Sequence, residues 1–352
     1  MSFHLYHLIA FLVSAIVVLW STPVVKTLGL KSGHVDHPNE RKVHRQPIVR
    51  LGGVSIFAST LIAVLIVWGL GGFEGLSAPE QAGIWGVAFG SVGFFLIGLA
   101  DDLFNLSPMS RLAMQVAIAI ISWQIGVKIE FLSMPFDNLV MHIGWLSLPI
   151  TVIWLVGMAN AINWIDGLDG LAAGVSGIAA VVMLIVTLFM DQPGAALLAA
   201  ALAGGALGFL RYNFNPAQIF MGDGGSYFMG FTLAGVGVIG LVKTTAVTAV
   251  LLPYLILAVP ILDMSAVIIS RVWQGKSPFL ADKRHLHHRL LDAGISQRLT
   301  VLFIYALTLW VGSLALAFSG IPSGAAYAIG ATMLLAYAGW QVWRRSGSNV
   351  SN

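Results

Sequence analysis

Long runs of apolar residues, separated by short polar segments, follow one another along the whole chain. A helix needs about 20 mostly apolar residues to cross a bilayer. Read in that unit, the pattern predicts about eleven membrane-spanning helices within one domain that covers residues 1–352. The predicted spans are 3–22, 51–72, 81–100, 111–127, 146–162, 170–190, 194–210, 227–242, 246–270, 299–319 and 324–343. We therefore expect an all-α, polytopic integral membrane protein.

Composition agrees with this class. Soluble domains carry about 25% charged residues, whereas this chain is 9% charged and 58% hydrophobic, with a mean hydropathy of +0.88. The sequence contains no cysteine, which excludes disulfide bonds and thiolate metal sites. A net charge of +3 is too small to indicate a nucleic-acid partner. Residues 1–22 lack a basic start and a small-residue cleavage site, so we expect a retained span rather than a signal peptide.

The basic residues are distributed unevenly between the predicted loops. With eleven spans, sixteen of the eighteen Lys and Arg residues fall on one side, and only Lys128 and Lys243 fall on the other. Cytoplasmic loops of membrane proteins carry an excess of Lys and Arg. This rule places the basic face, including the C terminus, in the cytoplasm and the N terminus outside.

Residues 160–170 combine two Asn, two Asp and two Gly between two apolar runs. Asn160, Asn163, Asp166 and Asp169 follow one another at intervals of three, so they can share one helical face. A polar seam that joins two helices is the structural alternative. Carboxylates near hydrocarbon are costly and usually functional, so the stretch predicts a wall of a nucleotide and metal site.

Two adjacent acids, Asp101 and Asp102, end the third predicted span. Oxygen ligands at a helix end suit Mg²⁺, and one carboxylate could act as a base. The structural alternative is that the acids cap the start of the next helix. Arg111 could pair with a phosphate or simply anchor the fourth span.

The loop over residues 36–53 is basic and enters the second span through two glycines. Lys42, Arg45 and Arg50 could hold phosphates, or the loop could rest against anionic lipid. In residues 211–226, Asp223 has only glycines beside it and Phe220 could stack on a base. A plain turn is the alternative for this segment.

Three histidines, His285, His287 and His288, stand among Lys and Arg residues in the last large loop. A zinc site is one interpretation, but neither Cys nor Glu lies nearby. Phosphate oxygens suit these donors better, and a solvated basic loop remains the alternative. Taken together, the loops on this face offer acids for a divalent cation, cations for phosphates and an aromatic ring for a base. This combination indicates phosphoryl transfer between a nucleotide-linked donor and a lipid phosphate.

In order along the chain, four motifs resemble those of the polyprenyl-phosphate N-acetylhexosamine-1-phosphate transferases, glycosyltransferase family 4. They are Asp101-Asp102, Asn160-x-x-Asn163-x-x-Asp166-Gly-x-Asp169-Gly-Leu, Gly222-Asp223-x-Gly225-Ser226 and His285-x-His287-His288. The resemblance covers essentially the whole chain. It implies transfer of a sugar-1-phosphate from a UDP-N-acetylhexosamine to undecaprenyl phosphate, with release of UMP. It further implies dependence on Mg²⁺, or Mn²⁺ in its place, a bacterial inner membrane location, a role in cell-envelope polysaccharide synthesis and often a homodimer.

The same resemblance assigns roles to individual residues. It makes Asp223 and Asn163 the metal site, and Asp101 and Asp102 the pair that deprotonates or orients the lipid phosphate. The residues implied in substrate binding are Arg45, Arg111, Asn160, Asn163, Gly167, Leu168, Asp169, Asn213 and Phe220. A catalytic role is implied for Asp166 beside the uracil and for His285, His287 and His288 over the pyrophosphate.

The His-x-His-His-Arg-Leu run resembles the branch that uses UDP-GlcNAc or related sugars, which leaves the sugar open among N-acetylhexosamines. The phospho-MurNAc-pentapeptide branch usually has Thr-Pro-Thr-Met-Gly-Gly where this chain has Pro47-Ile-Val-Arg-Leu-Gly-Gly. A CDP-alcohol phosphatidyltransferase is a weaker alternative, because Gly174 stands where its motif needs Arg. A transporter is the non-enzyme alternative. Transporters place polar groups near the bilayer midplane in repeated halves, whereas the polar groups of this sequence gather in loops at one face and no internal repeat is visible.

Overall fold

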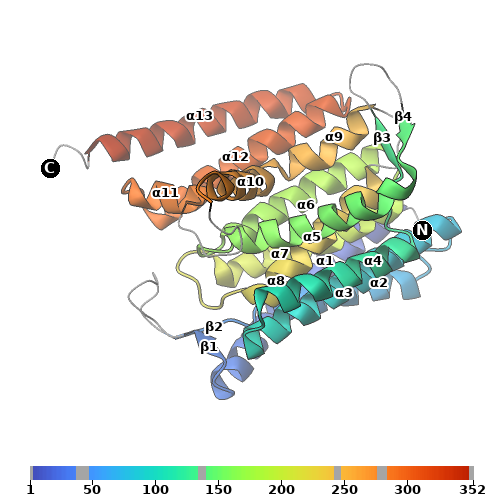
Figure 1. Cartoon of the computed structure of the whole chain (residues 1–352), viewed down its shortest axis with the longest axis horizontal. Coiled ribbons are helices and arrows are strands. Elements are labelled where there is room, and N and C mark those ends of the chain that lie inside the picture. Colours follow the sequence, from blue (N-terminus) through green and yellow to red (C-terminus); the bar gives the residue numbers. More distant parts are fainter. Residues whose placement is uncertain (1–2, 37–46, 134–139, 242–246, 276–283, 349–352) are drawn as a thin grey trace.

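The computed structural model describes residues 3–36, 47–133, 140–241, 247–275 and 284–348. Long helices run roughly side by side in one bundle (Figure 1). In chain order the helices are α1 (Phe3–Lys31), α2 (Gly53–Gly69), α3 (Ala78–Phe104), α4 (Pro108–Ile125), η1 (Gly144–Leu146), α5 (Ser147–Ile165), α6 (Leu171–Phe189), α7 (Pro193–Asn213), α8 (Gly222–Gly240), α9 (Val247–Ile256), α10 (Ala258–Trp273), α11 (Leu286–Asp292), α12 (Gln297–Phe318) and α13 (Gly324–Ser348).

Two short antiparallel strand pairs lie at opposite ends of this bundle (Figure 1). Strands β1 (Val35–Asp36) and β2 (Ile48–Val49) pair at one end, and β3 (Phe131–Ser133) and β4 (Val140–His142) form a hairpin at the other. The end that carries β1 and β2 also holds the turns that follow α3, α5 and α7, together with α11. We call it the polar end.

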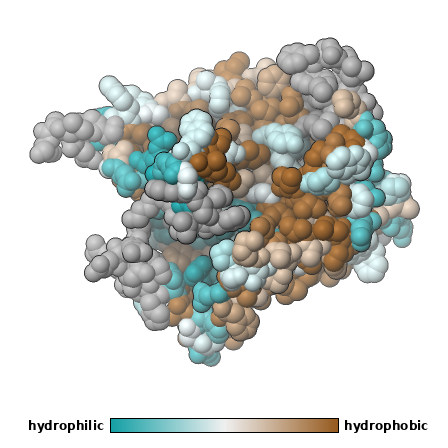
Figure 2. All heavy atoms as spheres, viewed as in Figure 1, coloured by the Kyte–Doolittle hydropathy of each residue, from teal (hydrophilic) through white to brown (hydrophobic). Residues whose placement is uncertain are grey.

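Six helices within the described residues are long and apolar enough to cross a membrane, namely α1, α3, α5 with its preceding turn, α6, α7 and α12. Helix α2 is also apolar but shorter. The class of an all-α membrane protein is therefore confirmed, while the count of about eleven spans stays a prediction. Figure 2 shows hydrophobic side chains over the middle of the visible face and hydrophilic ones toward the ends.

One predicted span, 246–270, is two helices in the structure. Helices α9 and α10 are separated at Leu257, whose φ and ψ of −101° and 17° leave the helical region. Pro260 explains the break, because it has no N–H for the carbonyl of Ile256 and its ring crowds that carbonyl. Hydropathy alone does not register such a break.

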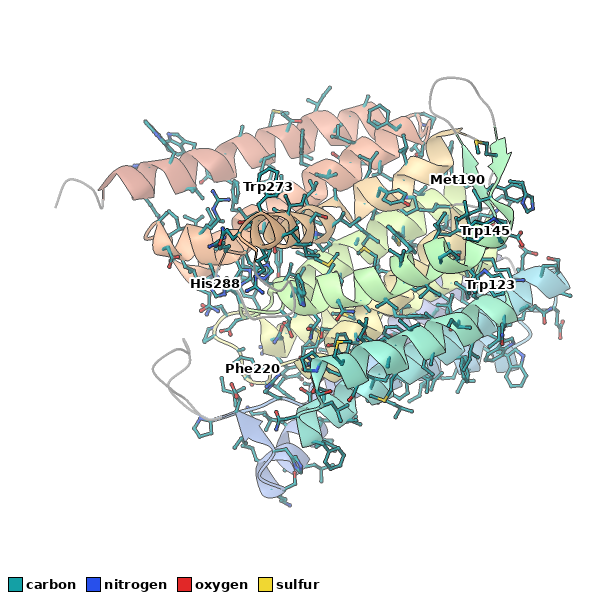
Figure 3. The ribbon with its side chains drawn as sticks, in the orientation of Figure 1. Trp123, Trp145, Met190, Phe220, Trp273 and His288 are labelled. Carbon is teal, nitrogen blue, oxygen red and sulfur yellow. The ribbon has the colours of Figure 1, made fainter. Side chains whose placement is uncertain are left out.

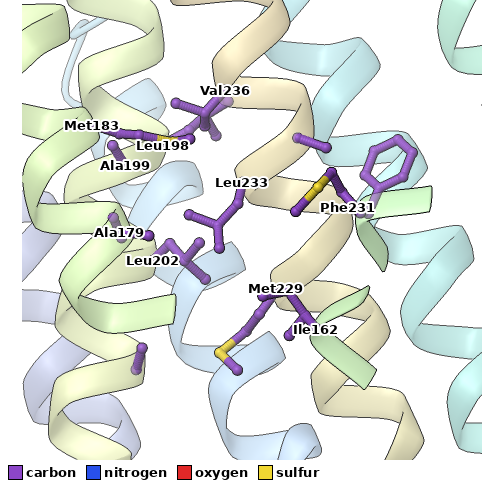
Figure 4. Packing of buried hydrophobic residues seen from close by; sticks show 14 of the residues in the cluster. Ile162, Ala179, Met183, Leu198, Ala199, Leu202, Met229, Phe231, Leu233 and Val236 are labelled. Carbon is purple, nitrogen blue, oxygen red and sulfur yellow. The ribbon is translucent and has the colours of Figure 1, made fainter. Parts of the chain in front are cut away.

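Helix α8 forms the centre of the bundle. Every residue from Gly222 to Gly240 is buried except Asp223. Figure 4 shows Met229, Phe231, Leu233 and Val236 packed between neighbouring helices. Glycines let the neighbours approach closely, as small residues do in membrane bundles. The one residue of α8 that is not buried therefore lies where the central helix meets the polar end.

Candidate active site at the polar end of the bundle

A backbone strap fixes the beginning of α8 to the segment before α2. The N–H of Phe220 donates to the carbonyl of Val49 at 2.8 Å, and the N–H groups of Gly52 and Gly53 donate to the carbonyls of Phe220 and Met221 at 2.9 and 2.7 Å. These bonds involve only main-chain atoms. The positions of Arg50 and Asp223 are therefore tied to each other by the backbone.

Gly222 makes this join possible. Its φ of +75° belongs to the left-handed region that disfavours other residues. A Cβ at this position would also collide with the carbonyl of Arg50 and lie 2.6 Å from a carboxylate oxygen of Asp102. The Gly222-Asp223 turn therefore requires glycine and packs tightly against Arg50 and Asp102, unlike a plain surface turn.

Asp102 caps the central helix from a neighbouring helix. Its two carboxylate oxygens accept hydrogen bonds from the N–H groups of Asp223 and Gly224, both at 3.0 Å. A carboxylate at a helix N-terminus is favourable because the N–H groups there lack partners within the helix. The structural alternative from the sequence was that the acids cap the helix that follows them. In the structure, Asp102 caps α8 instead.

Asp101 closes the turn between α3 and α4. It accepts from the N–H of Leu106 at 2.7 Å and forms an ion pair with Arg111. Both acids of the adjacent pair are thus engaged with protein groups. Their predicted contact with the lipid phosphate remains a prediction.

Two arginines flank the Asp223 carboxylate. Arg50 Nη2 lies 3.6 Å from Asp223 and 3.5 Å from Asp102, and Arg111 Nη1 lies 3.8 Å from Asp223. Their side chains are 43% and 26% exposed, so both guanidinium groups remain within reach of a ligand. Arg50 is one of the cations of the basic loop that the sequence suggested for phosphate binding. The predicted phosphate ligands Lys42 and Arg45 lie outside the described residues.

Asn163 joins α5 to the same carboxylate. Its Nδ2 donates to Asp223 Oδ1 and to Ser226 Oγ, both at 2.9 Å. This leaves the Oδ1 atom of Asn163 as an oxygen that could bind a cation. Asn160, one turn earlier, donates to Gln115 of α4 and to the carbonyl of Val156, both at 2.8 Å. Asn160 therefore joins α5 to α4. This is the polar seam between helices that was the structural alternative for residues 160–170.

The turn between α5 and α6 carries the second acid of the site. Burial, together with the nearby Asp223 carboxylate, raises the pKa of Asp166 to about 7. Asp169 instead braces the next loop, since its Oδ2 accepts from Asn215 Nδ2 and from the N–H of Ala217, both at 3.0 Å.

Asn213, predicted near the uracil, is buried and connects two loops. It accepts from the N–H of Gly170 at 3.1 Å and donates to the carbonyl of Ile219 at 2.9 Å. Leu168 is buried in the same turn. In the structure, Asn213 and Leu168 help to shape the turn. Neither the uracil contacts nor the other assigned roles are tested by this geometry.

The histidine run begins at His285 and continues into α11. His287 is buried with its Nε2 against Gly167, where an added Cβ would lie 2.5 Å from that nitrogen. Burial and the neighbouring His288 and His285 lower the pKa of His287 to about 3, so this ring is neutral at physiological pH. The rings of His287 and His288 are 4.3 Å apart. Figure 3 shows His288 and Phe220 at the same end of the bundle.

Asp263 of α10 is a site residue that the sequence reasoning missed. Its carboxylate pairs with His285 at 2.7 Å, although the residue belongs to a predicted apolar span. The available signal was a single acid inside that span, which usually marks function.

The oxygen donors around Asp223 fit Mg²⁺ better than zinc. Among the described residues there is no group of three or more His, Asp or Glu arranged to hold a metal ion. Magnesium commonly uses one or two carboxylates and fills its other positions with water and substrate phosphates. Asp223 and Asn163 could supply such oxygen ligands, and the Asp223 carboxylate is, after burial, a cause of the raised pKa of the nearby Asp166.

The fold and the site together define a helical membrane protein with a charge-rich, phosphate-compatible site at one end of its bundle. A family model described as glycosyl transferase family 4 matches residues 84–241. A probable undecaprenyl-phosphate N-acetylglucosaminyl 1-phosphate transferase of Bacillus subtilis is 38% identical over 85% of this chain and 81% of its own length.

Two further relatives agree with this match. The undecaprenyl-phosphate alpha-N-acetylglucosaminyl 1-phosphate transferase of Haemophilus influenzae is 31% identical over 87% of this chain and 85% of its own. The phospho-N-acetylmuramoyl-pentapeptide-transferase of Listeria monocytogenes is 29% identical over 66% of this chain and 73% of its own. The chain belongs to glycosyl transferase family 4, which confirms the resemblance found in its motifs.

Proposed function

We propose that this protein transfers GlcNAc-1-phosphate from UDP-GlcNAc to undecaprenyl phosphate and releases UMP, as a membrane step of cell-envelope polysaccharide synthesis. The observation that carries the proposal is the placement of Arg50 and Arg111 on either side of Asp223 at the polar end. The B. subtilis and H. influenzae relatives are named for this acceptor and this sugar.

In the proposed reaction, an oxygen of the lipid phosphate attacks the β-phosphorus of the donor. The bond from that phosphorus to the bridging oxygen breaks, and the bridging oxygen leaves with UMP. Negative charge grows on the phosphoryl oxygens and on the leaving group. Arg50 and Arg111 are suited to bind these oxygens, because guanidinium groups match phosphate geometry.

A divalent cation would complete this charge balance. Asp223 and the Oδ1 atom of Asn163 are the groups that would hold Mg²⁺, which when bound neutralises charge on the pyrophosphate. The strap between the α8 start and Gly52–Gly53 supports this role, because it holds the Asp223 main chain in place. The backbone thus supplies the rigidity that a phosphoryl-transfer site requires.

Asp101 and Asp102 act in this proposal by holding other groups. A phosphate monoester has a second pKa of about 6 and is mostly ionised at pH 7, so a strong base is not required. Asp102 fixes the Asp223 turn through two backbone bonds, and Asp101 orients Arg111. Both acids therefore position the phosphate-binding groups.

The donor nucleotide belongs on the other side of Asp223. Phe220 and His288 lie at this end of the bundle (Figure 3), and His287 contacts Gly167 of the Asp166–Gly170 turn. Phe220 offers a ring for the uracil, and the histidine run offers ring nitrogens that can form hydrogen bonds with the donor. In the predicted eleven-span topology, sixteen of the eighteen Lys and Arg residues fall on one side, which supports a cytoplasmic orientation in a bacterial inner membrane.

The test is release of UMP by the purified protein in detergent with undecaprenyl phosphate and Mg²⁺. UDP-GlcNAc, UDP-GalNAc and UDP-MurNAc-pentapeptide are supplied separately. We expect UMP from UDP-GlcNAc only, and only with lipid and metal present. UMP from the pentapeptide donor alone would replace the proposed sugar, and CMP release from a CDP-alcohol would replace the reaction class.

A further inference from the structure

Asp263 of α10 turns away from the membrane and into the histidine run. Its side chain is 8% exposed, whereas the neighbouring Leu262 is 66% exposed on the outer surface. Asp263 Oδ2 lies 2.7 Å from His285 Nδ1, and its Oδ1 accepts from the N–H of Leu286 at 2.7 Å. One carboxylate thus holds both the ring and the backbone where α11 begins.

This pairing restricts the chemistry of His285. A carboxylate only accepts hydrogen bonds, so the Nδ1 atom that faces it must carry the proton. Nε2 is then the ring nitrogen left for another partner. The ring itself has little freedom, since 9% of the side chain is exposed.

The rings that surround His285 connect it to the donor side of the site. Its ring lies 5.9 Å from that of Trp164, the residue that follows Asn163, and is stacked 5.6 Å from that of His287. His287 in turn rests on Gly167 in the turn that carries Asp166. A shift of His285 would therefore be passed on to His287 and to the turn that carries Asp166.

We propose that Asp263 is a positioning residue for the transfer reaction. It fixes His285 as the Nδ1–H tautomer and keeps the histidine run against the Asp166–Gly170 turn, so that His285 Nε2 is the atom available to accept a hydrogen bond from a hydroxyl or N–H group of the donor. The expected effect on the reaction rests on the proposed function, whereas the Asp263–His285 pair is present whichever reaction the protein performs. A carboxylate that orients a histidine is a recurrent device in catalytic and metal sites.

The first test is the tautomer of His285 in wild-type protein, read from ¹⁵N-histidine NMR spectra in lipid bilayers. The His285→Gln variant assigns the signal. We expect protonated Nδ1 in the wild type and a change to protonated Nε2 in Asp263→Asn, because the amide of Asn can donate to Nδ1. Protonated Nε2 in the wild type would overturn the proposal, even if the variant failed to fold.

The second test is kinetic. We expect Asp263→Asn to lower kcat for UMP release about 10-fold or more, with KM for UDP-GlcNAc within about 3-fold and an unchanged thermal midpoint. Asp292→Asn is the matched control, because this acid is exposed at the far end of α11 and should leave both constants unchanged. Wild-type kcat in a folded Asp263→Asn protein would also overturn the proposal. If the wild type released no UMP, the proposed function would fail, and the tautomer would still decide whether Asp263 sets the ring.

Discussion

At the scale of single residues, carboxylates and guanidinium groups are crowded around Asp223. Arg50 contacts two acids and Arg111 contacts two, so the site is a network rather than a set of separate pairs. Asp223 is the member that faces α5, α3 and the basic loop together. Removing its charge tests the network directly.

We expect Asp223→Asn to lower the rate of UMP release about 100-fold or more, a loss typical of removing a group that stabilises developing charge. The protein should fold normally, because Asn keeps the size of the side chain and relieves repulsion with Asp166. Rate and thermal midpoint are measured on the same sample. Asp191→Asn is the control, since that exposed residue with φ of 54° tolerates Asn and lies between α6 and α7. Full activity in folded Asp223→Asn would refute the metal assignment.

The buried, neutral ring of His287 should make the free energy of unfolding depend on pH. Its pKa is about 3 in the folded protein against 6.5 when exposed, so its stabilising contribution is complete above pH 6.5. Below pH 6.5 the exposed ring takes up a proton that the buried ring does not, and the contribution falls by about 1.4 kcal/mol per pH unit. We expect the thermal midpoint of the wild type to drop more between pH 7.5 and 5 than that of His287→Asn. His34→Asn, at an exposed histidine, should behave like the wild type, and equal slopes for all three proteins would contradict the assignment.

Sequence reasoning found most of the polar side chains at the site but could not tell which ones are free. Asp223, Asn163 and Asp166 lie close together at the polar end. Asp169 and Asn213 come to the same region, but each is bonded to neighbouring loops. A carboxylate that braces a loop and one that faces a ligand look alike in sequence, because the difference lies in contacts between distant segments.

At the scale of helices, glycine sets how closely α3 can approach α8. A Cβ on Gly98 would collide with the carbonyl of Asp223, which is main chain and cannot rotate away. We expect Gly98→Ala to push α3 outward, cost about 1–3 kcal/mol of stability and reduce activity by disturbing the bonds from Asp102 to the α8 start. Gly157→Ala is the control, because nothing lies within 4 Å of that position. Equal rates and thermal midpoints for both variants would show that the packing is looser than described.

Hydropathy identified where helices lie but not where they break. It merged α9 and α10 into one span because both are apolar on either side of Leu257. It gave no sign of α11, since seven residues among cations carry too little periodicity to stand out. Both omissions concern the elements that carry Asp263 and the histidines.

At the scale of the whole molecule, the two ends of the bundle differ in chemistry. The absence of cysteine from the sequence allows a direct test of which end faces the cytoplasm. Ser296 and Ser323 are exposed and precede α12 and α13, at opposite ends of α12. We expect Ser323→Cys to react with a membrane-impermeant thiol reagent in intact cells, and Ser296→Cys to react only in inverted vesicles. The reverse result would invert the orientation derived from the basic loops.

The main-chain strap between Val49–Gly53 and Phe220–Met221 has a consequence for inhibitor design. The strap consists of peptide groups and glycines, and replacing these glycines would disrupt the join itself. Few point mutations could therefore abolish the binding of a compound that contacts the main chain of this strap. We expect resistance to such a compound to arise in the surrounding loops or through higher enzyme levels, and sequencing of resistant isolates would reveal which.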